Sequence, residues 1–149
     1  MVEVLFYHLQ RRPLEAVLPT LLEKSLERGW RVVVQCGSEE RVEALNGHLW
    51  TFREDSFLPH GMRADGHAER QPIYLTSGAE NPNQAQVRFL VDRAVPGELA
   101  DYLRAVFIFD GRDPDAVSEA RGKWKEMQAA GHEVTYWQQD EGGRWVRGA

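Results

Sequence analysis

The sequence is poor in cysteine and has no long apolar run. A single cysteine, Cys36, among 149 residues excludes a disulfide framework and a four-cysteine zinc site, and it is typical of a reducing compartment. No apolar stretch approaches the roughly 20 residues that a transmembrane helix needs. Residues 1–13 have no basic segment ahead of an apolar one, as a signal peptide would. We therefore expect a cytoplasmic protein without membrane contact.

Positive charge is also in short supply. Lysine and arginine number 18 against 23 aspartate and glutamate residues, which gives a net charge of −5. A surface that binds duplex nucleic acid normally leaves a basic excess, because lysine and arginine neutralise the phosphates. The balance argues against a general polyanion binder, and we expect contact with nucleic acid to be mainly indirect, through protein partners.

The glycine-rich signatures of nucleotide binding are missing as well. The one Gly-Lys pair, Gly122-Lys123, is followed by Trp124 rather than the serine or threonine of a phosphate-binding loop. No glycine occurs between His8 and Pro13, where a dinucleotide-binding fold has its first glycine-rich turn. We therefore expect no nucleotide cofactor and no bound metal.

Two enzyme hypotheses nevertheless have a residue behind them. Asp110 follows the apolar run 107–109, and the magnesium-binding aspartate of nucleotide hydrolases also follows an apolar strand. A nucleotide- or phosphate-ester-binding enzyme that uses Asp110 is therefore the alternative function. An aspartate that caps the strand end is the simpler interpretation. Cys36 lies at a strand-to-helix turn, where a helix N-terminus can stabilise a thiolate, although a small buried apolar residue is the simpler interpretation.

The hydrophobic pattern predicts an α/β fold. Apolar, β-branched runs alternate with stretches of helical periodicity, and this rhythm indicates a mostly parallel sheet with right-handed crossovers. We expect strands over 2–7, 31–36, 73–75, 86–91, 104–109, 133–138 and 144–146, and helices over 13–28, 39–50, 96–103 and 114–130. Pro19 predicts a kink or an early end in the first helix. Residues 1–149 then form one domain, a three-layer open sheet.

The last predicted helix, 114–130, combines an apolar stripe with a basic edge. The stripe consists of Val117, Ala120, Trp124 and Met127. Arg121 and Lys125, four residues apart, follow one edge of it. A peptide that ends in a hydrophobic side chain and a carboxylate suits such a surface. An ordinary amphipathic helix, packed on the sheet with both cations solvated, fits the same pattern, so both interpretations stay open.

A second aromatic surface is predicted around the end of the helix over 39–50. Leu49 and Trp50 end the helix, and Phe57 and Pro59 follow in the long connection 51–72. Large aromatic residues dominate protein–protein contacts, which favours a partner-binding patch. The same side chains could instead fix the connection to the core.

Several of these segments, taken in order, resemble one family. They are Leu49-Trp50, Ser56-Phe57-Leu58-Pro59-His60-Gly61, Gln71-Pro72-Ile73, Phe109-Asp110, Ala120-Arg121, Trp124-Lys125, Tyr136-Trp137-Gln138-Gln139 and Gly143-Arg144-Trp145. In this order the chain resembles the chi subunit of bacterial DNA polymerase III, over Val2 to Trp145. Each segment alone is weak, and it is their ordered combination at matching length that is specific.

The resemblance implies a non-catalytic accessory subunit of the clamp-loader assembly. Its sheet would resemble a mononucleotide-binding (Rossmann-like) fold without the phosphate loop. Chi subunits pair with the psi subunit, which tethers them to the clamp loader. They also bind the acidic C-terminal tail of single-stranded DNA-binding protein, which ends in Asp-Asp-Ile-Pro-Phe. A repair helicase competes for the psi surface.

Transferred to this sequence, the resemblance assigns residues to both surfaces. The tail-binding arginine falls on Arg121, with Trp124 and Lys125 beside it, and we add Val117 as a pocket wall. The psi- or helicase-contacting aromatics fall on Trp50 and Phe57, flanked by Leu49 and Pro59.

Overall fold

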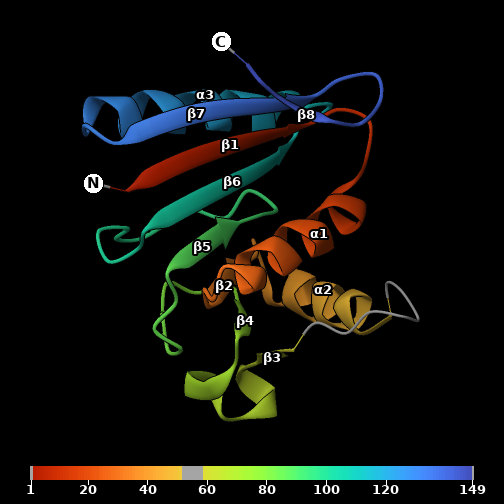
Figure 1. Ribbon diagram of the computed structural model, residues 1–149, viewed down its shortest axis with the longest axis vertical. Helices are drawn as coiled ribbons and strands as arrows, with labels where there is room; N and C mark the ends of the chain where they lie inside the picture. Colours follow the sequence, from red (N-terminus) through yellow and green to blue (C-terminus); the bar gives the residue numbers. More distant parts are fainter. Residues whose placement is uncertain (1, 52–58, 149) are drawn as a thin grey trace.

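The computed structural model describes residues 2–51 and 59–148, and these form one mixed α/β arrangement (Figure 1). Within this described part, the strands are β1 (Glu3–Leu9), β2 (Val32–Gln35), β3 (His60–Met62), β4 (Ile73–Thr76), β5 (Val87–Leu90), β6 (Arg104–Asp110), β7 (Glu133–Gln139) and β8 (Trp145–Arg147). The helices are α1 (Leu14–Glu27), α2 (Glu39–Thr51) and α3 (Pro114–Ala129), with short 3₁₀ turns at Arg63–Asp65 and Ala68–Arg70. The predicted α/β class is confirmed.

All the described strands belong to one sheet in the order β3-β4-β2-β5-β6-β1-β7-β8. Every neighbouring pair is parallel except β7 and β8, which are antiparallel. β1 and β6 are neighbours, yet their connections leave toward opposite ends of the sheet: α1 leads to β2, and α3 leads to β7. At such a switch point the carboxyl ends of two strands open a crevice in α/β proteins.

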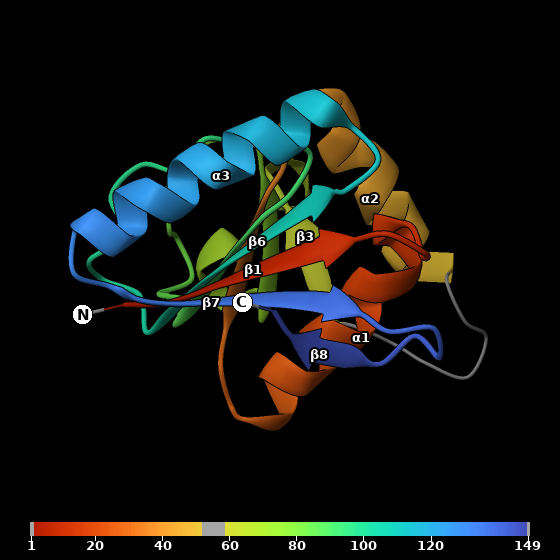
Figure 2. The ribbon, with the colours of Figure 1, turned by 90° about the horizontal axis from the view of Figure 1, so that it is seen from above.

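Helices cover both faces of the sheet, so its strands are buried on both sides. α1 and α3 lie on opposite sides of β1, β6 and β7 in Figure 2. Alternate residues of each strand therefore serve different cores: Leu5 packs toward α1 and α2, while Phe6 packs toward α3. Because Phe6 and His8 share the second face, β1 presents both side chains beneath α3.

The ends of α3 follow directly from the sequence. The Asp113 side chain caps the helix, accepting from the backbone N–H groups of Asp115 at 3.0 Å and Ala116 at 3.4 Å. Pro114 opens the helix, and Gly131, with φ +85°, follows its end, as predicted.

The structure differs from the sequence predictions at three places. Of the two effects predicted for Pro19, the early end is contradicted, because α1 continues to Glu27. Residues 96–103 form no helix: Leu99 and Tyr102 are buried, and this segment covers the sheet as an irregular strap. β3, a three-residue edge strand, was missed, because so short a run shows no alternation. Within the described residues, no helix has the length and apolarity that crossing a bilayer requires.

Candidate functional site

The side of α3 that faces β1 and β7 borders an open pocket, here called the α3 pocket. Its volume is about 270 Å³. Its lining residues are Phe6, His8, Phe109, Val117, Ala120, Arg121, Trp124, Tyr136 and Gln138. Three of the four predicted tail-binding residues, Val117, Arg121 and Trp124, thus line one cavity; Arg121 is exposed, and Val117 and Trp124 are half-buried.

Aromatic rings form most of the pocket wall. Trp124 meets Phe6 edge-on at a centroid distance of 5.6 Å and Tyr136 at 5.9 Å. Phe109 lies 5.0 Å from the His8 ring and 6.2 Å from that of Tyr136. These edge-to-face and tilted ring contacts fix one another in place. The cavity is therefore preformed and suits a flat or bulky apolar side chain.

Arg121 is the cation of this pocket. Its side chain is exposed and, among the residues that the structure describes, it forms no hydrogen bond or ion pair. The guanidinium keeps its planar set of donors for a ligand, and a carboxylate is the anion that matches their geometry. Lys125 is exposed one turn further along α3 and does not line the cavity.

His8 and Tyr136 add a polar edge to the same pocket. Nδ1 of His8 and the hydroxyl of Tyr136 are hydrogen-bonded to each other. Burial, and then the positive charge of Arg121, lower the pKa of His8, while Asp110 opposes them. Burial raises the pKa of Tyr136, against the opposing effect of Arg121. The imidazole is therefore neutral near pH 7 and the phenol keeps its proton.

The second predicted surface is only partly supported by burial. Trp50, at the end of α2, is 49% exposed, and its ring lies 4.3 Å from that of the buried His60. Pro59 is half-buried. Leu49, in contrast, is 1% exposed and packs in the core beneath α1 and α2, so its side chain anchors the helix and offers no contact surface. Phe57 lies outside the described residues.

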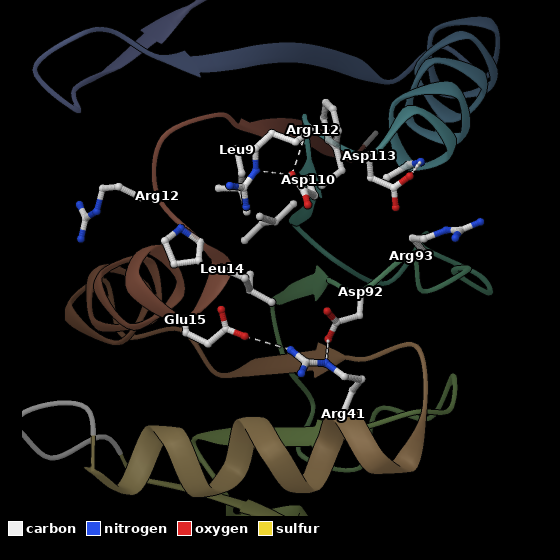
Figure 3. A pocket seen from close by; sticks show the side chains of 14 residues that line it. Leu9, Arg12, Leu14, Glu15, Arg41, Asp92, Arg93, Asp110, Arg112 and Asp113 are labelled. Carbon is white, nitrogen blue, oxygen red and sulfur yellow. Dashed lines mark hydrogen bonds and ion pairs between the residues drawn. The ribbon is translucent and has the colours of Figure 1, made fainter.

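A larger cavity, here called the edge crevice, lies at the switch point between β1 and β6. Its volume is about 380 Å³ and both acidic and basic side chains line it (Figure 3). Arg41 is held between Glu15 and Asp92, with both nitrogen–oxygen distances 3.1 Å. Arg12 and Arg93 point away from the centre of the crevice in Figure 3. Most of the charge in the crevice is already paired internally.

Two further features of the edge crevice oppose nucleotide binding. The carboxylate of Asp113 occupies the N-terminus of α3 and accepts hydrogen bonds from the backbone N–H groups there. A bound phosphate would need these same donors. The turn after β1 leads into α1 through Pro13, which has no N–H to donate. The crevice has the position of a nucleotide site, but these two positions do not offer backbone N–H groups to a phosphate.

Asp110, on which the alternative enzyme hypothesis rests, forms its hydrogen bonds within the turn that follows β6. Its carboxylate accepts from the backbone N–H of Arg112 at 2.9 Å and from the side-chain Nε of the same residue at 3.4 Å. Within residues 2–51 and 59–148, no three histidine, cysteine, aspartate or glutamate side chains gather as metal ligands would. The geometry supports the capping interpretation of Asp110.

Cys36 is buried and unsuited to nucleophilic chemistry. Its exposed fraction is 1%, and burial raises the pKa of its thiol to about 12, with Asp92 and Glu39 acting in the same direction. A thiol with this pKa is almost fully protonated at pH 7, and the thiolate is the reactive form. The structure contradicts the thiol-enzyme hypothesis.

Sequence reasoning found the helical half of the α3 pocket and missed the sheet half. His8 and Tyr136 are 128 residues apart and meet only because β1 and β7 pair in parallel. Strand alternation contained part of the signal: Phe6 and His8 had to share a face, as did Tyr136 and Gln138. Which strands are neighbours is what the sequence alone did not reveal.

Comparisons with known proteins point to one family. The family model described as DNA polymerase III chi subunit, HolC, matches residues 1–135. A probable DNA polymerase III subunit chi of Rickettsia prowazekii is 31% identical over 98 residues, which is 66% of this chain and 58% of that protein. The DNA polymerase III subunit chi of Pseudomonas aeruginosa is 28% identical over 112 residues, which is 75% of this chain and 77% of that protein.

Proposed function

The chain belongs to the DNA polymerase III chi subunit family, and from this premise we propose that it is a non-catalytic accessory subunit in DNA replication. In this proposal one surface holds the psi subunit of the clamp loader, and the α3 pocket holds the C-terminal tail of single-stranded DNA-binding protein. Residues 1–149 act as a single chi-like domain in the cytoplasm, with a fold like that of mononucleotide-binding proteins. A repair helicase is a further candidate partner for the psi surface.

The observation that carries the proposal is an unpaired arginine beside a preformed aromatic cavity. A tail ending in Ile-Pro-Phe offers a phenyl ring for the cavity and a terminal carboxylate for Arg121. The acidic residues before them meet Lys125, the exposed cation on the same helix. Both halves of the ligand therefore have a counterpart on the molecule.

The strength of this contact follows from its two parts. Burying a phenyl side chain contributes about 1.5–3 kcal/mol, and a charge-assisted contact about the same. After the cost of ordering the tail, we expect a total near −8 kcal/mol, which corresponds to a Kd of about 1 μM. Because the DNA-binding protein presents several tails together, a weak single contact is enough for retention on coated DNA.

Substitution of Arg121 tests the tail site. Arg121→Ala removes the charge-assisted contact, so the Kd for an Asp-Asp-Ile-Pro-Phe peptide should rise about tenfold or more. Fluorescence polarisation with a labelled peptide measures it, and thermal unfolding should show an unchanged Tm, because Arg121 is exposed and unpaired in the described structure.

Lys123→Ala is the matched control. Lys123 lies on the same helix and pairs with Glu126 at 2.9 Å, and it does not line the α3 pocket. Its removal changes the net charge by the same amount and should leave the Kd within about twofold. Equal effects of the two substitutions on the Kd would show that Arg121 contributes only its net charge, and they would contradict the assignment of the binding site.

A further inference from the structure

Two polar side chains of the α3 pocket have no role in the contacts proposed so far. Parallel pairing of β1 and β7 places Phe6 opposite Tyr136 and His8 opposite Gln138. His8 and Tyr136 are thus diagonal neighbours on the face under α3, and their side chains are hydrogen-bonded through Nδ1 and the hydroxyl. Arg121 borders the same cavity from the helix.

The imidazole of His8 is held on several sides. A side chain at position 111 would overlap Nε2 of His8, so the imidazole ring fills the space beside Gly111. The Phe109 ring lies 5.0 Å away on another side. Tyr136 is fixed in turn by the edge of Trp124. The direction of the Tyr136 hydroxyl is therefore set by its surroundings.

We propose that Tyr136 is a second hydrogen-bond donor to the carboxylate of a peptide end bound at Arg121, and that His8 positions its hydroxyl. In the bound state Nδ1–H of His8 donates to the phenol oxygen, which leaves the phenol O–H free to donate to the carboxylate. This inference rests on the proposed tail-binding function and specifies how the same site recognises its ligand.

The arrangement links binding to the protonation of His8. A neutral imidazole carries one proton, on Nδ1 or on Nε2, and only the first form can donate to Tyr136. The protonated ring always carries a proton on Nδ1. In the free chain the charge of Arg121 is, after burial, the second cause that lowers the pKa of His8. A carboxylate bound at Arg121 offsets that charge, so the pKa of His8 rises on binding.

The sign of the pH dependence follows from this change. A group whose pKa rises on binding takes up a proton, so the affinity increases as the pH falls through the range of that pKa. The charged and titratable groups facing His8 are Asp110 on β6, itself paired with Arg112, Arg121 on α3 and Tyr136 on β7. Among the residues lining the pocket, His8 alone has an ordinary pKa between pH 5 and 8.

The experiment is calorimetric titration of the full chain with an N-acetylated peptide that ends in Asp-Asp-Ile-Pro-Phe with a free carboxylate. For the wild type we expect the Kd to fall about three- to tenfold from pH 7.5 to 5.5, since one unit of pKa change corresponds to tenfold. His8→Asn keeps a side-chain amide that can donate to Tyr136 but does not titrate, and its Kd should be independent of pH. Tyr136→Phe should raise the Kd about three- to tenfold at pH 5.5, because it removes the phenol donor, while the part of the pH dependence that comes from Arg121 and His8 remains.

Proton uptake by the wild type gives a readout that needs no variant. Titrations at pH 6.0 in two buffers of different ionisation enthalpy should show a fraction of a proton bound per peptide, and none for the same peptide with an amidated C-terminus. A pH-independent Kd without proton uptake, or an unchanged pH dependence in His8→Asn, would overturn this inference while tail binding stands. Absence of wild-type binding at every pH would instead overturn the proposed function.

Discussion

Arg88 lies in β5 with an exposed fraction of 1%, and it forms no ion pair with any described residue. Its guanidinium donates instead to neutral oxygens: Oε1 of Gln35, the backbone carbonyls of Gly78 and Glu80, and the hydroxyl of Tyr102. These bonds join two strands to the segments that cover this half of the sheet. Arg88 thus holds these irregular segments against the sheet through its hydrogen bonds.

Replacement of Arg88 by methionine should be strongly destabilising. The substitution leaves several buried oxygens without a donor, and we expect a loss of about 3–5 kcal/mol in the free energy of unfolding. Urea unfolding followed by circular dichroism measures it. Arg88→Lys keeps the charge but not the planar donors, so it should lie between methionine and wild type. A loss below about 1 kcal/mol for methionine would show that water or a shifted side chain replaces the donors.

The residues of the α3 pocket fall into two groups: those that are close together in the sequence, and those that only the fold brings together. Val117, Arg121 and Trp124 share one helix face, so the spacing of 3.6 residues per turn predicted their grouping. His8 and Tyr136 depend on strand order. Leu49 was misassigned as a surface residue, because the resemblance that marked Trp50 did not show which way its neighbour faces.

Among the helices, α1 contains a proline and still continues for two further turns. Pro19 has no N–H to donate to the carbonyl of Glu15, which is therefore left without its helical partner. Nε2 of His48 on α2 donates to this oxygen at 2.7 Å. Arg41, also on α2, pairs with the Glu15 side chain. The gap that the proline leaves in α1 therefore becomes a contact between α1 and α2.

A double-mutant cycle can measure this contact. His48→Leu should cost about 1–2 kcal/mol of stability, since it leaves the Glu15 carbonyl without its donor. In a Pro19→Ala background the backbone N–H of residue 19 serves the same carbonyl, so the cost of His48→Leu should shrink by about 0.5 kcal/mol or more. Urea unfolding of the four proteins gives the coupling. Strictly additive effects would contradict the link between Pro19 and His48.

The regular elements were predictable where their pattern was long. Apolar runs and helical periodicity located seven of the strands and the three long helices of the described chain, to within a few residues. β3 was too short to show a pattern. The expected helix at 96–103 did not form, because burial of Leu99 and Tyr102 against the sheet outweighs the weak helical pattern around Pro96.

For the whole molecule, the sheet separates the two proposed binding surfaces. Trp50 ends a helix that packs on one face, and Arg121 lies on the helix that covers the other. Figure 1 shows α3 at the top and α2 well below it, with β1 and β6 at heights between the two helices. Under the proposed function, we therefore expect the two surfaces to bind their partners independently.

Paired substitutions test this independence. Trp50→Ala should weaken capture of the cognate psi subunit about tenfold or more, as expected for an exposed tryptophan in an interface, and leave the peptide Kd unchanged. Arg121→Ala should do the reverse. Surface plasmon resonance with immobilised psi and polarisation with the tail peptide provide the two readouts. Loss of both activities in either variant, with an unchanged Tm, would contradict separate surfaces.

The antiparallel strand β8 determines how a ligand chain can approach the α3 pocket. β8 pairs with Trp137–Gln139, and Gly148 N–H donates to the carbonyl of Tyr136 at 2.6 Å, so this edge of β7 is already occupied. An incoming chain cannot extend the sheet at this edge of β7, so under the proposed function the tail is recognised by side-chain contacts of its terminal segment at the α3 pocket and at Lys125. Under the proposed function, the C-terminal segment is sufficient for recognition. If it were appended to an unrelated protein, that protein should bind this chain, whatever its own fold.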